Sequence, residues 1–299
     1  MKVLILGSNG LVGTSVKNVL ERNPNIKELI CATRNDADLF NFDETKELIE
    51  NSKPDIMINA AAKVGGIYAN SSKRTEFILE NLKINVNILE ASIPFSNMYI
   101  INLGSSCIYP LEADNPIKEE SVMSGKLEPT NSPYAMAKLT AIEIGDALSD
   151  QYGHKVLNLM PTNLYGPFDN FDSKKSHVIP ALIKKVFKEK KLKVWGDKNV
   201  IRDFVYVDDL SKVILELLKN KNNLKVNFSS ATGTSIGKLA NLVNKISKQN
   251  KMIIYQKSKP SSAKYRVLNN AKISKLIKIK RTNLEDGLKK TIDWYKKKY

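Results

Sequence analysis

The chain has 299 residues, 42% of them hydrophobic, and a formal net charge of +16 from 47 Lys and Arg against 31 Asp and Glu. This length allows about two domains with a sizeable core, so we expect a soluble globular protein. The lysines are dispersed along amphipathic patterns such as IKKVFKEKKLK, which favours solvated helix faces over nucleic-acid binding and predicts only that anionic substrates are attracted.

The opening segment MKVLILGSNG is too short an apolar run for a signal sequence. No later run approaches the roughly 18 apolar residues of a membrane-spanning helix, so we predict a cytoplasmic protein without a membrane partner. The two cysteines, Cys31 and Cys107, are too few for a disulfide framework and lack metal-ligand spacing. The sequence therefore predicts free thiols and no metal.

Apolar strand-like runs alternate with helical periodicity from the first residue. Strands are expected at KVLILG, ELICAT, DIMINAAA, MYIINLGSS and VLNLMP, and helices at 11–22, 43–51, within 72–92 and at 133–150. This alternation is typical of βαβ units and predicts a parallel sheet buried on both faces. Past about residue 165 it loosens into SHVIPALIKKV, KVWG, FVYVDDL, KVNFSS and a last helix from Leu284.

These patterns predict an α/β protein with a Rossmann-like doubly wound parallel sheet. The sheet domain is expected over residues 1–165, with a return of the chain around 200–230. A smaller, mixed α/β C-terminal substrate lobe is expected over 166–299.

Three glycines in GSNGLVG, at Gly7, Gly10 and Gly13, close the first strand and open the first helix. They permit a tight turn, close approach of a pyrophosphate and packing of the helix on the strand, and the helix N-terminus favours negative charge. The pattern is specific only because a strand precedes it and a helix follows it. It predicts a dinucleotide cofactor.

The choice between NADP(H) and NAD(H) depends on the end of the second strand. A site for NAD(H) usually has an acid about 20 residues beyond the glycine loop. This chain has Arg34 there, which suits a 2′-phosphate and favours NADP(H). The alternative is that Arg34 is an exposed loop cation and that Asp36 or Asp38 reaches the ribose.

The segment NSPYAMAK places Tyr134 and Lys138 four residues apart on one helix face, with Asn131 or Ser132 as the cap. A nearby ammonium favours the phenolate form of tyrosine and so brings it into the range of proton transfer. Ser105 lies at the end of an upstream strand, where parallel sheets bind ligands. Together these residues predict acid–base chemistry beside the cofactor.

These residues resemble the extended short-chain dehydrogenase/reductase family. Within it they resemble the GDP-L-fucose synthases, which are GDP-4-keto-6-deoxymannose 3,5-epimerase-4-reductases. The resemblance covers nearly the whole chain. The matching segments, in order, are GSNGLVG, NAAAKVGGI, GSSCIYP, LEPTNSPYAMAK, MPTNLYGPFDNF, SHVIPAL, VWG, RDFVYVDD and SKP.

The resemblance implies a role for each matching residue. Tyr134 would protonate the sugar O4 as hydride reaches C4, Lys138 would lower the pKa of that tyrosine and bind the nicotinamide ribose, and Ser105 would bind the 4-keto oxygen. Cys107 and His177 would be the base and the acid that epimerise C3 and C5. The ordinary alternatives for these two are a small buried cysteine and a helix-capping histidine.

The resemblance also implies two sets of binding residues. The cofactor-binding set is Gly7, Gly10, Leu11, Val12, Gly13, Arg34, Asp38, Leu39, Ala61, Ala62, Tyr134, Lys138, Pro161, Asn163, Leu164 and His177. The substrate-binding set is Ser105, Ser106, Cys107, Asn163, Val178, Lys184, Trp195, Arg202 and Arg266. Trp195 could equally be a core residue and Arg202 a member of a surface ion pair.

The chain departs from the family pattern in two places. Asn9 stands where a basic residue is common, which leaves the preference for NADP(H) to Arg34. Residues 261–266 read SSAKYR where the family has Asp-Gly and a Pro-Arg pair, and Lys264 or Arg266 could replace the missing arginine. A GDP-4-keto-6-deoxy-heptose is therefore an alternative substrate for an epimerase/reductase or a C4-reductase.

Two further alternatives stay open at this point. One is a nucleotide-sugar 4-epimerase or dehydratase that retains its NAD. The other is a non-catalytic NADP(H) sensor, which would have no use for the Ser105, Tyr134 and Lys138 relay. In the family, the helices around 72–92 and 133–150 form a dimer bundle, so a homodimer is expected.

Overall fold

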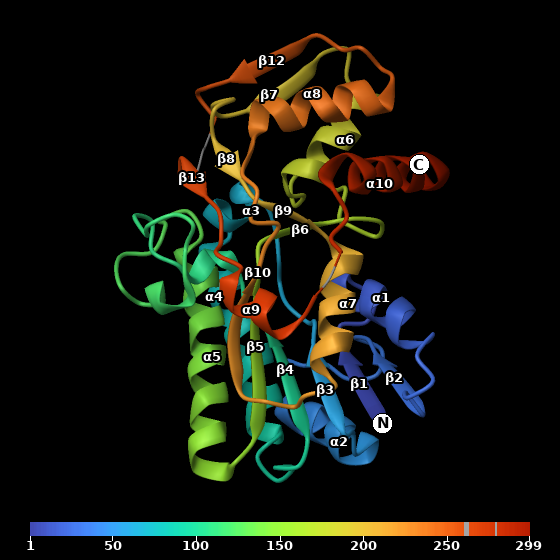
Figure 1. Cartoon of the computed structure of the whole chain (residues 1–299), viewed down its shortest axis with the longest axis vertical. Coiled ribbons are helices and arrows are strands. Elements are labelled where there is room, and N and C mark those ends of the chain that lie inside the picture. The colour runs from blue at the N-terminus through green and yellow to red at the C-terminus, as the bar shows by residue number, and fades with distance from the viewer. Residues whose placement is uncertain (260–262, 279) are drawn as a thin grey trace.

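A six-stranded parallel sheet forms the larger part of the molecule in this computed structural model, which describes residues 1–259, 263–278 and 280–299 (Figure 1). The strands lie in the order β10-β5-β4-β3-β1-β2. Their bounds are β1 Lys2–Leu6, β2 Glu28–Ala32, β3 Ile56–Asn59, β4 Tyr99–Leu103, β5 Lys155–Pro161 and β10 Leu224–Phe228. The strand order reverses between β1 and β3, the position at which doubly wound sheets bind ligands.

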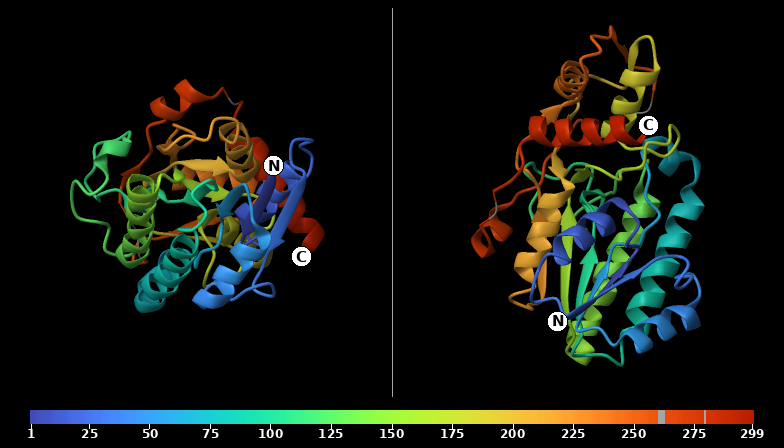
Figure 2. Two further views of the ribbon diagram at one scale, coloured as in Figure 1. Left: turned by 90° about the horizontal axis from the view of Figure 1, so that it is seen from below. Right: turned by 90° about the vertical axis from the view of Figure 1, so that its right-hand side faces the viewer.

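Helices cover both faces of this sheet, as Figure 2 shows from two sides. Helices α2 (Phe42–Ser52), α4 (Arg74–Ala91) and α5 (Ser132–Tyr152) lie on one face, and α1 (Leu11–Leu20) and α7 (Val207–Leu217) on the other. Alternate residues of β1 explain the two layers, because Val3 and Ile5 pack in one core and Leu4 and Leu6 in the other. A strand buried on both faces reads as a continuous apolar run, as predicted.

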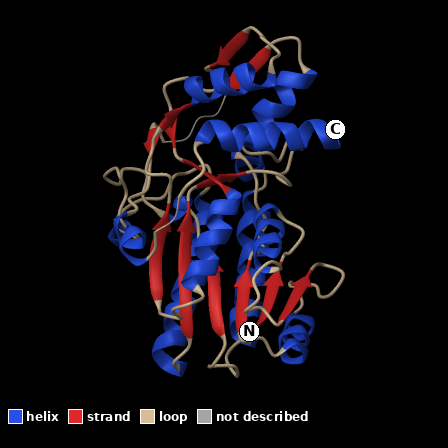
Figure 3. Cartoon of the chain, turned by 45° about the vertical axis from the view of Figure 1, so that its right-hand side comes forward, coloured by secondary structure: helices blue, strands red, loops and turns tan. Residues whose placement is uncertain are grey.

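A smaller lobe stands over the carboxyl ends of the strands (Figure 3). It contains α6 (Val178–Lys188), β7 (Leu192–Trp195), α8 (Ile236–Ser247), β12 (Ile253–Gln256) and α10 (Leu284–Lys298). Short pairs connect it to the sheet: β6 (Asn163–Tyr165) with β9 (Phe204–Tyr206), and β8 (Ile201–Arg202) with β11 (Thr234–Ser235) and β13 (Tyr265–Arg266). The remaining elements are α3 (Ile67–Ser72), α9 (Ala271–Leu276) and two short 3₁₀ turns, Ser106–Ile108 and Glu119–Ser121.

The chain crosses back to the sheet domain with α7 and β10, inside the range 200–230 named from the sequence. It returns once more with α9, which packs on β10 and was not expected. Within the described ranges, no helix is both long and apolar enough to span a membrane.

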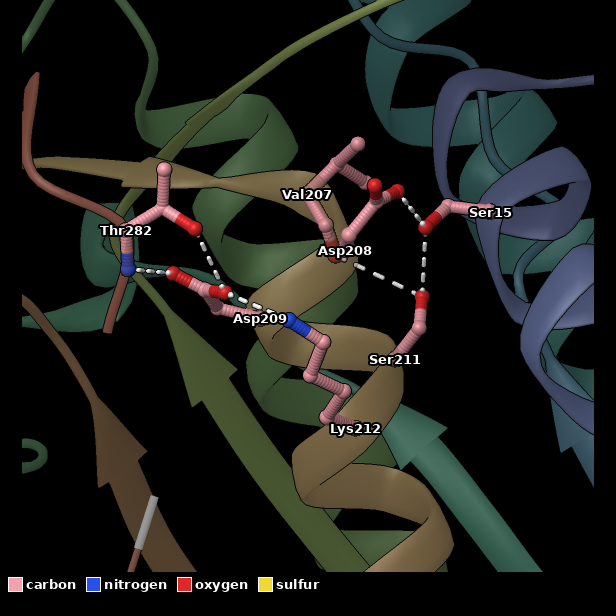
Figure 4. Close-up of polar contacts among 7 residues, drawn as sticks. All are labelled: Ser15, Val207, Asp208, Asp209, Ser211, Lys212 and Thr282. Carbon is pink, nitrogen blue, oxygen red and sulfur yellow. Dashed lines mark hydrogen bonds and ion pairs between the residues drawn. The ribbon is translucent and has the colours of Figure 1, made fainter. Parts of the chain in front are cut away.

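A buried polar seam ties α7 to two distant segments (Figure 4). Ser15 of α1 donates a hydrogen bond to Asp208 Oδ1 at 2.6 Å and lies 2.7 Å from the Ser211 hydroxyl. Asp209, 1% exposed, accepts hydrogen bonds from the backbone N–H and the hydroxyl of Thr282 at 2.6 and 3.0 Å. The helix that follows the glycine loop is thereby joined to the segment that leads into the C-terminal helix of the smaller lobe.

Candidate active site

The glycine loop has the close backbone packing that its sequence requires. Gly7 has φ +76°, and a Cβ built on it would lie 2.8 Å from the backbone nitrogen of Ala61. A Cβ on Gly13 would lie 2.3 Å from the carbonyl oxygen of Gly7. A side chain would clash at either position, so glycine is required there. The absence of side chains allows the first turn of α1 to pack closely against the end of β1.

A cavity of about 410 Å³ opens beside this loop. It is lined by predicted cofactor residues from several elements: Gly7, Gly10, Arg34, Asp38, Leu39, Ala61 and Ala62. Gly10 precedes the first turn of α1, and a Cβ there would meet only the Gly7 carbonyl oxygen, at 3.5 Å. Open backbone at a helix N-terminus fits a pyrophosphate, so the residues present fit a dinucleotide.

The acidic alternatives to Arg34 are engaged locally. The Asp36 carboxylate accepts hydrogen bonds from the backbone N–H and the hydroxyl of Thr33, both at 2.8 Å, and these bonds lower its pKa. Asp38 accepts a hydrogen bond from the backbone N–H of Phe40 at 3.0 Å. Arg34 is exposed at the cavity and has no hydrogen bond or ion pair with the described residues. Its guanidinium is therefore available to an anionic ligand.

Lys138 is held at the carboxyl end of β4. Its ammonium donates a hydrogen bond to the carbonyl oxygen of Leu103 at 2.8 Å, and the residue is 3% exposed. Burial lowers the pKa of Lys138 to about 8. Because Ser105 lies two residues beyond Leu103, one strand end positions both predicted catalytic groups.

Tyr134 follows in the first turn of α5 and packs edge-on against Phe77, with ring centroids 6.4 Å apart. Burial raises its pKa, the nearby Cys107 raises it further, and a hydrogen bond with the Ser105 side chain opposes the rise. The expectation that Lys138 holds this pKa low differs from the structure, because burial outweighs every other influence on the phenol. The phenol is therefore kept protonated, as a proton donor must be.

Cys107 lies in the 3₁₀ turn that follows β4. Its backbone N–H donates to the Ser105 hydroxyl at 3.2 Å, and the Asn131 amide donates to its sulfur at 3.2 Å. Burial raises the pKa of the thiol, whereas the Ser105 side chain and the positive charges of Arg266 and Arg202 lower it. Asn131 precedes α5 as predicted, but its side chain bonds the sulfur instead of capping the helix.

His177 lines a second cavity, of about 230 Å³, between the sheet and the smaller lobe. Its side chain is exposed and it precedes the first turn of α6. The surrounding protein lowers the pKa of the imidazole by desolvation, which makes its protonated form a stronger proton donor. The loop before α3 supports this position, because a Cβ on Gly66 would lie 2.3 Å from the carbonyl oxygen of Ser176.

The second cavity gathers four of the nine predicted substrate-binding residues: Asn163, Val178, Trp195 and Arg202. Leu164 and His177, which were predicted to bind the cofactor, line the same cavity. Arg202 connects the cavity to the thiol, because the charge of Arg202 and Cys107 influence each other's pKa. The Ser105 side chain lowers the pKa of both Cys107 and Tyr134, so the three residues lie close together.

Five predicted substrate residues are not in this lining: Ser105, Ser106 and Cys107 of the loop after β4, Lys184 and Arg266. Lys184 is not among the lining residues of this cavity, whereas Lys185 is, and its ammonium lies 5.1 Å from the centre of the Trp195 ring. Arg266 is 7% exposed and donates to backbone carbonyls of the Cys107 loop. Sequence reasoning also missed Tyr68, whose ring packs edge-on against Trp195 at 6.4 Å. The neighbouring GGI motif was the available signal for it.

Of the remaining predicted residues, Leu11, Val12 and Gly13 form the first turn of α1, and Pro161 ends β5 at the sheet edge that faces the smaller lobe. Ser106 contributes its carbonyl oxygen to Arg266. Lys264 is described, but residues 261 and 262 of the unusual segment, and Pro260 of the SKP motif, lie outside the described residues. Among the residues that are described, no cluster of His, Cys, Asp and Glu could hold a metal ion.

Comparison with known proteins gives consistent matches. The model of the NAD dependent epimerase/dehydratase family matches residues 3–228. The chain is 37% identical to a GDP-L-fucose synthase of Sinorhizobium fredii over 298 residues, which covers 98% of this chain and 94% of the relative.

Solved structures agree. A GDP-6-OMe-4-keto-L-xylo-heptose reductase from C. jejuni superposes with a TM-score of 0.92 at 27% identity, covering 99% of this chain and 98% of that one. A GDP-L-fucose synthetase from Naegleria fowleri bound to NADP superposes with a TM-score of 0.89 at 26% identity, covering 99% and 94%.

Proposed function

The chain belongs to the NAD dependent epimerase/dehydratase family, and on that premise we propose that it converts a GDP-4-keto-6-deoxy sugar by 3,5-epimerisation and NADPH-dependent 4-reduction. The substrate is GDP-4-keto-6-deoxy-D-mannose and the product is GDP-L-fucose. The observation that carries the proposal is the position of Ser105: its hydroxyl accepts a hydrogen bond from the Cys107 backbone N–H at 3.2 Å, and its side chain lowers the pKa of both the Tyr134 phenol and the Cys107 thiol. Ser105 thereby lies beside both Tyr134, the group proposed for reduction, and Cys107, the group proposed for epimerisation.

The cofactor is NADP(H), which supplies the hydride for C4 when bound. The glycine loop and Ala61 hold its pyrophosphate, and Arg34 takes the 2′-phosphate, since a guanidinium binds phosphate through two hydrogen bonds. Lys138, fixed on the Leu103 carbonyl, contacts the nicotinamide ribose.

The epimerase step begins with the acidity of the C3 and C5 hydrogens, which comes from the neighbouring C4 ketone. Removal of either proton leaves an enolate whose negative charge lies on O4. Ser105 and Tyr134 donate hydrogen bonds to O4 and so stabilise that charge. Cys107 removes the proton as thiolate and becomes a thiol, and His177, acting as imidazolium, returns a proton on the opposite face of the ring.

The reductase step uses the same two residues, Ser105 and Tyr134, at O4 of the sugar. As C4 receives hydride, its oxygen becomes an alkoxide and takes the proton of Tyr134. The raised pKa of Tyr134 supports this role because the phenol is fully protonated near neutral pH. Lys138 is held in the first turns of the same helix.

The nucleotide end of the substrate occupies the second cavity. Its lining supplies an aromatic ring at Trp195, flanked by the ammonium of Lys185, and a guanidinium at Arg202. Aromatic rings and cations are the groups that bind a nucleobase and a diphosphate. Val178, Asn163 and His177 line the same cavity.

A GDP-4-keto-6-deoxy-heptose is the second candidate substrate. Two observations favour it: the TM-score of 0.92 to a heptose reductase, and the replacement of the family pattern at residues 261–266. A C4-reductase acting on such a heptose would use Ser105 and Tyr134 without the proton transfers of Cys107.

We also propose a homodimer located in the cytoplasm. Helices α4 and α5 pack on each other, and they carry the half-exposed apolar side chains Leu79 and Met136. Such side chains on adjacent helices suit a helix bundle between two copies.

A panel assay tests the proposal. The protein is incubated with NADPH and with GDP-4-keto-6-deoxymannose or the corresponding heptose, and NMR identifies each product. We expect NADPH oxidation with the mannose derivative and inverted C3 and C5 in the product. Reduction of the heptose alone, or a product with unchanged C3 and C5, would replace this assignment by the second candidate.

A further inference from the structure

Arg266 and Arg202 form an unusual pair of like charges. Strands β13 and β8 are parallel, and their register sets Arg266 directly opposite Arg202. Burial and the charge of Arg266 together lower the pKa of Arg202 to about 10. Like charges directly opposite each other destabilise a sheet, so this pair needs compensating negative charge nearby.

The contacts of Arg266 do not supply that charge. Its guanidinium donates to the carbonyl oxygens of Ser106 and Pro110, at 2.9 and 3.4 Å, and the residue is 7% exposed. Among the described residues, no carboxylate lies within ion-pair distance of it. A buried guanidinium bound only to neutral carbonyls is costly, which makes a structural role alone a poor explanation.

The two carbonyls bracket the turn that carries Cys107. Arg266 and Arg202, from two strands of the smaller sheet, act on the thiol with positive charge. Glu128, from the loop before α5, acts with negative charge, and Tyr134 of α5 also interacts with the thiol. The Asn131 amide donates to the sulfur. Glu128 and the Cys107 thiol therefore both lie within electrostatic reach of Arg202.

We propose that Arg266 is a positioning residue of the epimerase step: it holds the Cys107 turn through the Ser106 and Pro110 carbonyls and places a positive charge beside the thiol. This inference rests on the proposed function, because its consequence is the removal of the sugar protons by Cys107. Its electrostatic part concerns the protein alone and can be measured without substrate.

The test follows alkylation of the protein by iodoacetamide as a function of pH, with peptide mass spectrometry to read Cys107 and Cys31 separately. Arg266→Gln keeps a side-chain N–H donor and removes the charge. It should move the inflection of Cys107 alkylation upward by about one pH unit, because an opposite charge at close range lowers a pKa by about 1–3. Arg266→Lys should restore much of the shift.

Two further variants give controls of opposite kinds. Glu128→Gln removes the negative neighbour and should move the Cys107 inflection downward. Arg281→Gln removes another partly buried guanidinium, one that interacts with Asp203 and Asp209 and not with the thiol, and should leave the inflection unchanged. Alkylation of Cys31 should follow the same pH curve in every variant.

The outcomes separate this inference from the proposed function. An unchanged Cys107 inflection in Arg266→Gln, or an equal shift in Arg281→Gln, overturns the role of Arg266. Should Arg266→Gln fail to fold, an unchanged inflection in Glu128→Gln overturns the electrostatic account in its place. If the shift occurs but the parent protein exchanges no C3 or C5 hydrogen of a 4-keto sugar, the proposed function fails and the electrostatic assignment stands.

Discussion

Replacement of Lys138 by methionine should make the folded protein more stable while it removes activity. Burial lowers the pKa of Lys138 from 10.5 to about 8. At about 1.4 kcal/mol for each tenfold change in an equilibrium constant, this costs the folded state about 3 kcal/mol near neutral pH. The hydrogen bond to the Leu103 carbonyl offsets about 1.5 kcal/mol of that cost. Methionine fills a similar volume, so Lys138→Met should gain about 1–2 kcal/mol.

The pH dependence of this gain has a definite sign. Between the folded pKa of about 8 and the unfolded value of 10.5, the unfolded chain binds more protons at Lys138, so the parent becomes more stable as pH rises. The advantage of Lys138→Met is therefore complete below about pH 8 and disappears by about pH 10.5. Urea unfolding of both proteins at several pH values measures the difference, because all other titrating groups are shared.

Two results would refute this reasoning. One is a Lys138→Met protein that is less stable than the parent near neutral pH. The other is a stability difference that stays constant from neutral pH to about pH 10.5, since a neutral or solvated Lys138 would give no such dependence. NADPH oxidation, measured on the same samples, should be lost in the variant, as expected where a costly buried charge is retained for function.

Three further substitutions address separate parts of the site. Tyr134→Phe should lower turnover by about 10²-fold or more with cofactor binding kept, and near-normal NADPH oxidation would exclude Tyr134 as the proton donor. Arg34→Ala should weaken binding of NADPH far more than that of NADH, and equal losses in titrations of both would make Arg34 a surface cation. His177→Asn should exchange the C3 and C5 hydrogens in deuterated water without inverting the carbons, and inversion at the parent rate by NMR would remove His177 from the acid role.

The sheet domain could be predicted because its signals are local. The strand-like runs and helical periods give the order of elements, and the predicted helix over 133–150 differs from α5 (Ser132–Tyr152) by one or two residues at its ends. The glycine loop is similarly local, since the close approach of Gly7 and Gly13 to neighbouring backbone is a property of the turn itself.

Which lysine of α6 lines the cavity could not be predicted in the same way, because the answer depends on the rotation of the helix about its axis. Ile179, Leu182 and Ile183 face the core of the smaller lobe. Lys185 lies about two helical turns beyond Val178, so both face the cavity, whereas Lys184 is not in that lining. A single-residue error in the start of a helix is enough to exchange two adjacent lysines.

Long-range contacts account for the other differences. A residue before a helix normally caps it, but Asn131 meets a sulfur from 24 residues earlier in the chain. The sequence predicted Arg266 at the substrate because residues 261–266 lack the arginine that the family has there, and Arg266 could replace it. Instead the pairing of β13 with β8 turns it to carbonyls 160 and 156 residues away. No periodicity in the sequence reports such a partner.

The central claim is that Ser105 and Tyr134 act on O4 of the sugar in both epimerisation and reduction, with Cys107 as the epimerase base. The most direct measurement is hydrogen exchange at C3 and C5 of GDP-4-keto-6-deoxymannose in deuterated water with the oxidised cofactor, followed by NMR for the parent and for Cys107→Ala. The account predicts exchange at both carbons in the parent and none in Cys107→Ala, while that variant still binds NADPH. Exchange of both hydrogens by Cys107→Ala at the parent rate would contradict it, and would leave Cys107 as a packing residue of a simple 4-reductase.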